Sequence, residues 1–309
     1  MKISELKENM AIEMLMLVSQ AESGVTNSGS PYLSIVFRDN SGQIEGKLWD
    51  VKPEQREVVK PGKIISVKAD VISYRKSTQL KVTGVSAVEN DNISLEDFVP
   101  SGPVPIDELR TAIYTAIDDI DDFEIKAIVS AIFRKHDRQI FASPAASRNH
   151  HEYYGGLVTH ISEMLNIAYA ICKLYPTLNR DLLLAGILLH DIGKIDELRS
   201  GAVTEYTLEG KLLGHISISQ TMVQETADEL GIEGEKVLLL RHMILAHHGK
   251  QEFGSPVLPQ IMEAEVLHMI DDMDAKMTMI QKELDKVEPG EFTARIYTLD
   301  NRAFYKPKQ

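Results

Sequence analysis

The chain has 309 residues, of which 43% are hydrophobic and 26% charged, a composition typical of soluble globular proteins. A length above about 250–300 residues favours two domains over a single core. The longest apolar run, Leu182 to Leu189, is far shorter than the ~20 residues of a membrane-spanning helix, and the first ten residues lack the apolar core of a secretory signal. A single cysteine, Cys172, excludes an internal disulfide and a cysteine-based zinc cluster. We therefore expect a cytoplasmic protein without membrane association.

The net charge of −13 is unevenly distributed along the chain. Residues 1–90 hold 12 Lys and Arg against 11 Asp and Glu, so nearly all of the negative charge belongs to the remainder. Histidine is segregated as well, because all ten lie between His136 and His268. A region rich in His and Asp has the side chains that bind divalent cations. A helical domain with a charged surface has the same composition, so the spacing of these residues must decide.

The first 90 residues contain short segments typical of β-strands, with a turn at 39–42. Five such segments with hairpin turns predict a small closed barrel of the OB type, although a β-sandwich suits the local pattern equally. The expected strands span residues 11–18, 32–37, 43–49, 63–71 and 78–88.

Residues 91–105 are rich in proline and glycine and predict a linker between this barrel and a second domain at 106–309. Beyond the linker, apolar residues recur at three- and four-residue steps, which indicates helices. Apart from a strand-like stretch at 203–208, the second domain is expected to be helical throughout. Its methionines, among them Met262, Met269, Met273 and Met277, have near-helical spacing and are predicted to fill the core.

Several histidines and aspartates of the second domain stand at the predicted ends or inner faces of helices. His190 and Asp191 follow eight apolar residues, and burying such a polar pair is costly unless a cation compensates it. If this pair stood alone, a helix end exposed to solvent would explain it. Several His and Asp residues in similar positions along the chain instead favour a metal site. These residues are His160, His190, Asp191, His215, His247, His248 and Asp271.

The order His … His-Asp … Asp resembles the signature of the HD-domain phosphohydrolases, with HDIGK (190–194) as its most specific part. The resemblance implies His160, His190, Asp191 and Asp271 as metal ligands. The strings PAASRNHHEYYGGLVTH, HDIGKIDEL and NRAFYKP, with IEGKLWD and YRKSTQLK in the first domain, are similar to the YhaM-type 3'-5' exoribonucleases. This similarity covers nearly the whole chain and implies an OB-fold barrel followed by an all-α HD domain, with an HD core at about 157–275.

The family resemblance implies metal-dependent removal of nucleotides from the 3' end of single-stranded RNA, and of single-stranded DNA, as nucleoside 5'-monophosphates. It favours one or two ions of Mn²⁺ or Co²⁺, with Fe²⁺, Zn²⁺ and Mg²⁺ as alternatives. A phosphohydrolase of free nucleotides, with the barrel as a regulatory or assembly module, would share the same ligands. A binding protein with a structural metal site is the third reading. Self-association into a homo-oligomer is compatible with an acidic helical domain.

Three residues are predicted to act in catalysis: Asp191, Lys194 and His215. The Asp191 carboxylate could bridge two ions ~3.5–4 Å apart, with His215 and His247 completing the second position. Adjacent helical residues point about 100° apart, which favours His247 as the ligand and leaves His248 to contact nucleic acid. Lys194 would place a positive charge on a phosphate oxygen, or it is simply a cation at a helix end.

A nuclease that trims single strands must also hold the strand, and an OB barrel offers aromatic faces for bases and cations for phosphates. Trp49 and Phe37 could stack on bases, but aromatic residues of strands belong more often to the core, which is the favoured interpretation. His150 and His151 suit either the strand terminus or a solvated loop. The predicted nucleic-acid contacts are Tyr32, Arg38, Tyr74, Arg75, Lys76, Lys81, His150, His151 and His248.

Overall fold

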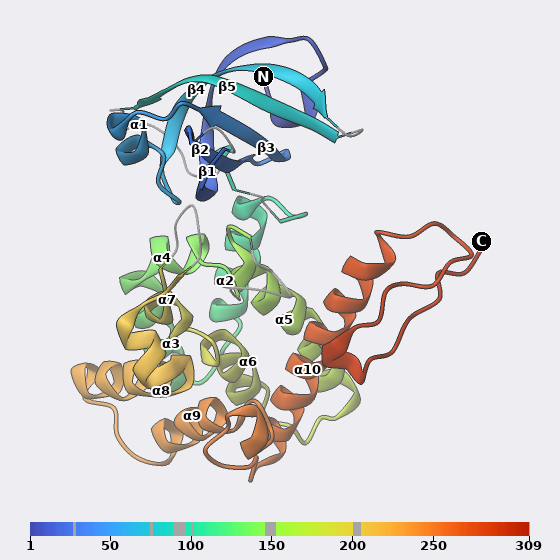
Figure 1. Cartoon of the computed structure of the whole chain (residues 1–309). Coiled ribbons are helices and arrows are strands. Elements are labelled where there is room, and N and C mark those ends of the chain that lie inside the picture. Colours follow the sequence, from blue (N-terminus) through green and yellow to red (C-terminus); the bar gives the residue numbers. More distant parts are fainter. Residues whose placement is uncertain are drawn as a thin grey trace. The chain divides into compact units, whose positions relative to one another are not determined.

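The structure, a computed structural model, describes residues 1–26, 29–74, 77–88, 97–99, 102–145, 153–199 and 205–308. The chain divides into two compact units, residues 1–101 with 200–205, and residues 102–199 with 206–309 (Figure 1). A β-barrel forms the first unit and a bundle of helices the second, each around its own hydrophobic core, as the sequence predicts. Among the described residues, none of the helices has the length and apolar character needed to cross a membrane.

Five strands close the barrel in the order β1-β2-β3-β5-β4, with β3 and β5 parallel and the other pairs antiparallel. Alternate side chains point inward with the period of two that a strand imposes, and Phe37 is fully buried, which settles its role as a core residue. The strands are β1 (Ala11–Val25), β2 (Pro31–Asp39), β3 (Gly42–Trp49), β4 (Ile64–Tyr74) and β5 (Ser77–Ala87).

One element of the barrel unit escaped prediction. Helix α1 (Pro53–Val58) connects β3 to β4 and has proline at its first position, where the missing N–H costs nothing. With six residues and no buried side chain, it is too short to show an apolar period.

The second unit is built around α6 (Arg180–Leu189), whose residues from Leu182 to Leu189 are all buried. Helices α3, α5, α9 and α10 pack against it, so the end of α6 lies inside the unit. The helices of this unit are α2 (Ile106–Asp118), α3 (Phe123–Lys135), α4 (Asp137–Ala142), α5 (Gly156–Leu174), α6, α7 (Lys194–Glu197), α8 (Leu208–Leu230), α9 (Glu235–Ala246) and α10 (Met262–Leu284).

The last helix corrects one prediction. Met262, Met269, Met273 and Met277 are between 43% and 61% exposed instead of filling the core. Helix α10 turns another face inward, formed by Ala264, Leu267, Ile270 and Asp274.

Outside the barrel, the chain also contains more extended structure than predicted. Strand β6 (Leu198–Arg199) pairs with β7 (Glu205–Tyr206), near the expected stretch at 203–208, of which residues 203 and 204 lie outside the described residues. Beyond α10, two isolated β-bridges join Phe292 to Tyr305 and Ile296 to Arg302. The unit is therefore helical with a short extended segment at its C-terminal end.

Candidate active site

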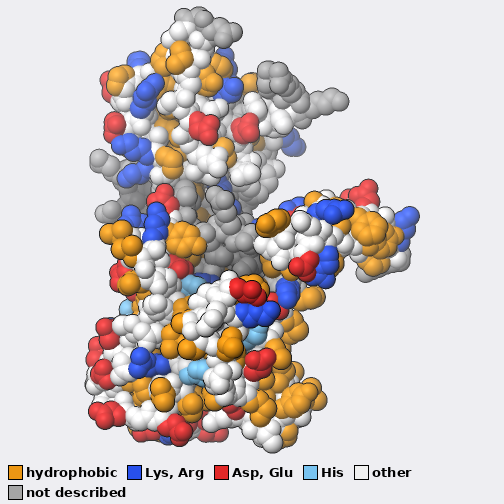
Figure 2. All heavy atoms as spheres, turned by 60° about the horizontal axis from the view of Figure 1, so that its bottom comes forward, with side chains coloured by type: hydrophobic (Ala, Val, Ile, Leu, Met, Phe, Trp, Pro, Cys, Tyr) orange, Lys and Arg blue, Asp and Glu red, His pale blue; other side chains and the backbone are white. Residues whose placement is uncertain are grey.

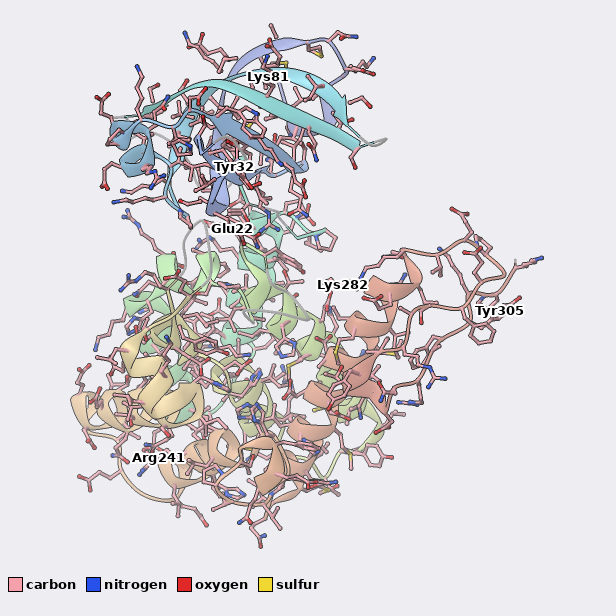
Figure 3. The ribbon with its side chains drawn as sticks, viewed as in Figure 1. Glu22, Tyr32, Lys81, Arg241, Lys282 and Tyr305 are labelled. Atoms are coloured by element: carbon pink, nitrogen blue, oxygen red, sulfur yellow. The ribbon has the colours of Figure 1, made fainter. Side chains whose placement is uncertain are left out.

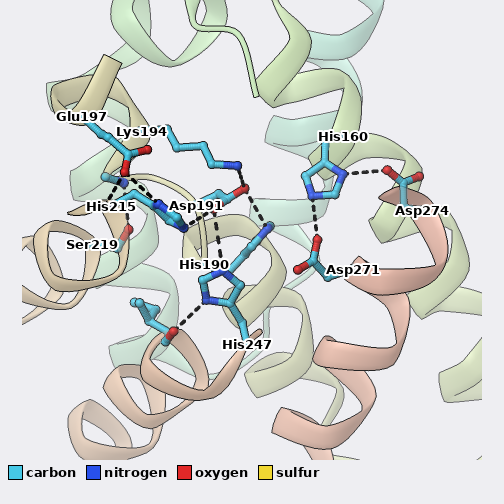
Figure 4. Close-up of polar contacts among 12 residues, drawn as sticks. His160, His190, Asp191, Lys194, Glu197, His215, Ser219, His247, Asp271 and Asp274 are labelled. Atoms are coloured by element: carbon cyan, nitrogen blue, oxygen red, sulfur yellow. Dashed lines mark hydrogen bonds and ion pairs between the residues drawn. The ribbon is translucent and has the colours of Figure 1, made fainter. Parts of the chain in front are cut away.

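Residues in or directly after α5, α6, α8, α9 and α10 meet where α6 ends (Figure 4). His190 and Asp191 follow the last residue of α6 and are 0% and 2% exposed. His160 comes from α5 and His247 follows α9, and both imidazoles are buried as well. Asp271 on α10 places a carboxylate oxygen 3.2 Å from His160 Nε2. The four residues of the His … His-Asp … Asp order are thus brought together by the fold.

Two glycines allow α8 to approach this centre. Gly193 N–H donates to Ser219 Oγ at 2.8 Å, and a Cβ atom at Gly193 would lie only 2.4 Å from the carbonyl oxygen of His215. Gly214 has φ 72° and ψ 153°, which interrupts α8 so that a new helical run starts at His215. The HDIGK turn can therefore pack directly against α8 and bring His215 to Asp191.

The Asp191 carboxylate lies between two groups of histidines. Its Oδ2 is 3.3 Å from His190 Nε2, while its Oδ1 is 3.3 Å from His215 Nε2 and 3.7 Å from His247 Nε2. Lys194 Nζ also contacts Oδ2. Burial opposes ionisation of Asp191, but the charges of Lys194 and His190 outweigh it and hold the pKa of this carboxyl well below its usual range. The centre therefore contains a buried carboxylate with a different neighbour at each oxygen.

The five imidazoles around this carboxylate all contact the protein through the same ring nitrogen, Nδ1. Each places Nδ1 at a hydrogen-bond acceptor of the protein, so that Nδ1 donates and Nε2 is the nitrogen that could bind a ligand, although Nε2 of His160 already lies 3.2 Å from Asp271 Oδ1. The acceptors are Ile187 O for His190 at 2.8 Å, Ile244 O for His247 at 2.7 Å, Phe253 O for His248 at 2.8 Å, Glu197 Oε1 for His215 at 3.1 Å and Asp274 Oδ2 for His160 at 2.6 Å.

The inner atoms of the centre lack hydrogen-bond partners among the described residues. They are the Nε2 atoms of His190, His215 and His247 together with Asp191 Oδ1, all of them buried. Leaving such atoms unsatisfied costs ~1–3 kcal/mol each, more where a group is charged. Imidazole nitrogen and carboxylate oxygen are ligands for divalent transition metals, so the residues present fit one or two such cations.

The possible ligand atoms form two groups, within each of which all of these atoms lie within 4.8 Å of one another. One group is His160, His190 and Asp191, and the other is His215, His247 and His248. Asp191 Oδ1 faces the second group, so its carboxylate could serve both. Such an arrangement is compatible with a two-metal centre.

His248 lies closer to His247 than we expected, and its role as a nucleic-acid contact stays a prediction. We expected its side chain to diverge from His247, yet the two ring centroids are 4.2 Å apart and both imidazoles belong to the second ligand group. The divergence assumed a continuing helix, whereas α9 ends at Ala246. Burial, with the neighbouring imidazole charges, lowers the pKa values of both histidines, which keeps them neutral and able to bind a cation at neutral pH.

Two carboxylates behind the centre were missed by sequence reasoning. Burial opposes protonation of His160, but hydrogen bonds to Asp271 and Asp274 outweigh it and raise the pKa of His160 to about 10. Asp274 stands three residues after Asp271 on α10, a spacing that could have revealed it. Glu197 accepts from both the backbone N–H and Nδ1 of His215, and no sequence pattern pointed to it.

Behind Asp274 lies a third carboxyl, that of Glu163. Burial and the adjacent Asp274 carboxylate raise the pKa of Glu163 to about 7. His160 is thus backed by a chain of two acidic groups.

A cavity of about 660 Å³ opens from the centre and lies within the second unit. Asp191, His215, His248 and Asp271 belong to its lining, which shows that the ligand groups are accessible from it. Its size falls within the ~300–1,000 Å³ of typical ligand pockets. Its cationic side chains are Lys194, Lys250, Lys276 and Arg302.

The barrel presents part of the predicted nucleic-acid face. Tyr32 and Arg38 lie at outward positions of β2, and Lys81 lies on β5 opposite Lys47 of β3; Figure 3 labels Tyr32 and Lys81. Trp49 is 44% exposed, so it belongs to this face and not to the core. Its ring centroid is 5.1 Å from that of Tyr32, and Lys47 Nζ lies over both rings at 5.5 and 5.6 Å.

Four predicted contacts, Arg75, Lys76, His150 and His151, lie outside the described residues. Tyr74 ends β4, but its side chain is not described. Their roles stay predictions.

An OB barrel joined to a helical unit with a His and Asp centre defines an HD-domain protein with a nucleic-acid-binding module. The corresponding family models match: an HD domain over residues 157–276, and an OB-fold nucleic acid binding domain over residues 17–88. The chain is 44% identical over 297 residues to the 3'-5' exoribonuclease YhaM of Bacillus subtilis (strain 168), covering 96% of this chain and 95% of that protein. It is 45% identical over 293 residues to the YhaM of Oceanobacillus iheyensis, covering 94% and 92%. The chain therefore belongs to the YhaM family of 3'-5' exoribonucleases, as its motifs predicted.

Proposed function

We propose that this protein is a divalent-metal-dependent 3'-5' exoribonuclease that trims single-stranded RNA, and single-stranded DNA, to nucleoside 5'-monophosphates. The observation that carries the proposal is the Asp191 carboxylate, buried between two groups of possible ligands, with the buried Nε2 atoms of His190, His215 and His247 lacking hydrogen-bond partners among the described residues. The relatives named 3'-5' exoribonuclease supply the substrate and the direction.

The cation would be held by His160, His190, Asp191 and Asp271, with His215, His247 and His248 available for a second ion. We favour Mn²⁺ or Co²⁺, which accept this mixture of nitrogen and oxygen ligands. When bound, such an ion lowers the pKa of water towards ~7 and neutralises charge on the phosphate.

The side chains around the centre have separate tasks. Lys194, which contacts Asp191 Oδ2 in the structure, is near enough to offer its charge to a non-bridging phosphate oxygen instead. Glu197 fixes the His215 ring through Nδ1, so that His215 keeps Nε2 directed at the reacting centre. Because the cavity is large enough for a nucleotide, the terminal residue of a strand can enter it.

The barrel would bind the strand upstream of the scissile bond. Tyr32 and Trp49 offer exposed rings, while Lys47 and Lys81 are neighbours on paired strands and offer charges to phosphates. Because the whole chain has a net charge of −13, we expect few neutralised phosphates and a shallow dependence of affinity on salt.

The test uses 5'-labelled single-stranded RNA with a free 3'-hydroxyl, incubated with the full chain and Mn²⁺. We expect a ladder of products shortened by one nucleotide, and release of 5'-monophosphates detected by chromatography. A chelator and the Asp191→Asn variant should both abolish the ladder. Asp196→Asn, which removes a nearby carboxylate outside the cavity lining, serves as the matched control and should retain it.

Parallel reactions with nucleoside triphosphates and cyclic nucleotides test the phosphohydrolase reading. Hydrolysis of these small substrates, without shortening of the RNA, would overturn the exoribonuclease proposal while keeping the metal centre. A ladder that persists in Asp191→Asn would instead contradict the assigned centre.

A further inference from the structure

The segment that follows α10, Gly290–Lys308, is called the C-terminal arm. Its two halves pair with each other: Gly290 N–H donates to Lys306 O at 2.7 Å, and Ile296 N–H donates to Arg302 O at 2.9 Å. Between them the chain reverses at Asp300 and Asn301, with φ of 55° and 56°. Asp and Asn tolerate this left-handed region better than most residues, so the sequence suits the turn.

The arm is attached to α10 at both ends of its hairpin. Lys306 Nζ donates to the carbonyl oxygen of Leu284 at 3.0 Å, which satisfies a group that the end of α10 leaves open, and to that of Val287, beyond the helix, at 2.9 Å. At the turn, Leu299 is 2% exposed and Thr298 Oγ1 lies 3.4 Å from Met279 Sδ. These contacts indicate that the turn has a defined position beside the helix.

This turn forms one wall of the catalytic cavity. Thr298, Leu299, Asp300 and Arg302 belong to the same lining as Asp191. The Arg302 side chain is 56% exposed, and its Nε donates to Leu299 O while Asp300 Oδ2 lies 3.9 Å away. A partly exposed guanidinium is therefore held in the lining of the cavity, with its Cζ 5.5 Å from the centroid of the Phe304 ring.

The arm also has side chains of the types found in single-strand binding sites. It carries four Lys and Arg against two Asp and Glu, although the whole chain has a net charge of −13. Tyr297 is 84% exposed, and the Phe292 and Tyr305 rings, 5.1 Å apart, are 65% and 45% exposed. Figure 2 shows hydrophobic and basic side chains side by side on this projecting segment, and Figure 3 labels Tyr305 near its end.

We propose that the turn of the C-terminal arm binds the RNA strand next to its 3' end, with Arg302 at a backbone phosphate and Tyr297 stacked on a base. This inference rests on the exoribonuclease function proposed above. Alternation of aromatic and cationic side chains is the chemistry of a single-strand platform. A protein-binding surface would also expose aromatic rings, but it would not need to share a wall with the catalytic cavity.

The test compares KM and kcat of the full chain with those of Arg302→Gln and Tyr297→Ala on a single-stranded RNA 12-mer in Mn²⁺. Both residues are largely exposed, so the variants should melt at the wild-type temperature. We expect KM to rise about 10-fold in each, as the loss of one base or phosphate contact implies, while kcat stays within about 2-fold. Arg295→Gln removes the same charge from the same arm outside the cavity lining and should leave KM unchanged.

Unchanged KM in both variants, with a wild-type protein that degrades RNA, would overturn this inference alone. An equal rise in Arg295→Gln would overturn the assignment to the turn, because general electrostatic attraction would then explain it. If the variants also change molar mass in light scattering, the arm is a contact between copies of the chain and not a strand platform. A wild-type protein that does not degrade RNA would instead refute the proposed function.

Discussion

The two units of this protein bury polar groups in different ways. Within the described part of the barrel unit, the one buried charged side chain is Asp39, whose oxygens accept from the N–H groups of Ile3, Ser41 and Gly42. The helical unit buries His190, Asp191 and His247 with inner atoms that have no partner among the described residues. The buried carboxylate of the barrel is thus satisfied by the chain itself, whereas the helical centre presents buried polar atoms that a cation could satisfy. The proposed RNA binding by the barrel uses side chains on its surface, whereas the proposed catalysis uses buried polar side chains of the helical unit. The two functions therefore constrain different kinds of position in the sequence.

The largest effect is expected when the carboxylate that supports His160 in the helical unit is removed. Asp274→Asn should lower Mn²⁺ affinity and kcat/KM by ~10–100-fold, the usual cost of losing a carboxylate behind a metal-binding histidine. Isothermal titration calorimetry measures the affinity, so the result does not depend on turnover. Asp285→Asn, at the exposed end of the same helix, is the matched control. Wild-type Mn²⁺ affinity in Asp274→Asn would show that His160 needs no such support.

The second prediction concerns pH. The raised pKa of His160, about 10, means that the metal-free protein carries a proton there at neutral pH, which a cation at Nε2 must displace. Apparent Mn²⁺ affinity should therefore rise with pH between 6 and 8, by up to ~10-fold per unit for one proton released. Calorimetry in buffers of different ionisation enthalpy counts this proton.

The raised pKa of His160 also predicts how the stability of the protein changes with pH. Because the folded-state pKa of His160 lies above its unfolded value of ~6.5, its contribution to the free energy of unfolding is complete below pH ~6.5 and is lost as pH rises through about 10. Chelator-treated protein should become less stable over this range. Mn²⁺ affinity independent of pH would contradict the assigned protonation.

On the barrel, removal of an exposed ring should affect binding alone. Trp49→Ala should raise KM for RNA about 10-fold with kcat nearly unchanged, because one stacked base contributes ~1–3 kcal/mol. Tyr175→Ala removes a 58% exposed ring at the end of α5 and provides the control. A fall in kcat without a change in KM would contradict the proposal that the barrel binds RNA while the helical unit carries out catalysis.

The smallest effect on catalysis is expected at the barrel's own buried carboxylate. Asp39→Ala leaves backbone N–H groups without their acceptor and should lower the free energy of unfolding by ~1–3 kcal/mol. Urea denaturation measures this loss. Mn²⁺ content should remain that of the wild type, and its loss would show that the centre depends on the barrel interior.

Parts of the site could be predicted from sequence because the signals were local. The string HDIGK follows an apolar run from Leu182 to Leu189, and His160 and Asp271 stand in the family order on either side of it. Glu197 could not be found in this way, since it reaches His215 only through the packing of α7 on α8, where Gly210 would place a Cβ 2.3 Å from the Glu197 carbonyl oxygen. The position of His248 depended on where α9 ends, which periodicity fixes only to within a few residues.

The amino-acid sequence by itself determined the two-part architecture, the family and the identity of the histidines and aspartates, because periodicity and motif order are local properties of the chain. The tertiary structure alone decided which oxygen of Asp191 faces which imidazole, that every Nδ1 of the five is engaged, and that the C-terminal arm lines the cavity. These features join residues far apart in sequence, and their distances follow from how whole helices pack, which no local pattern records.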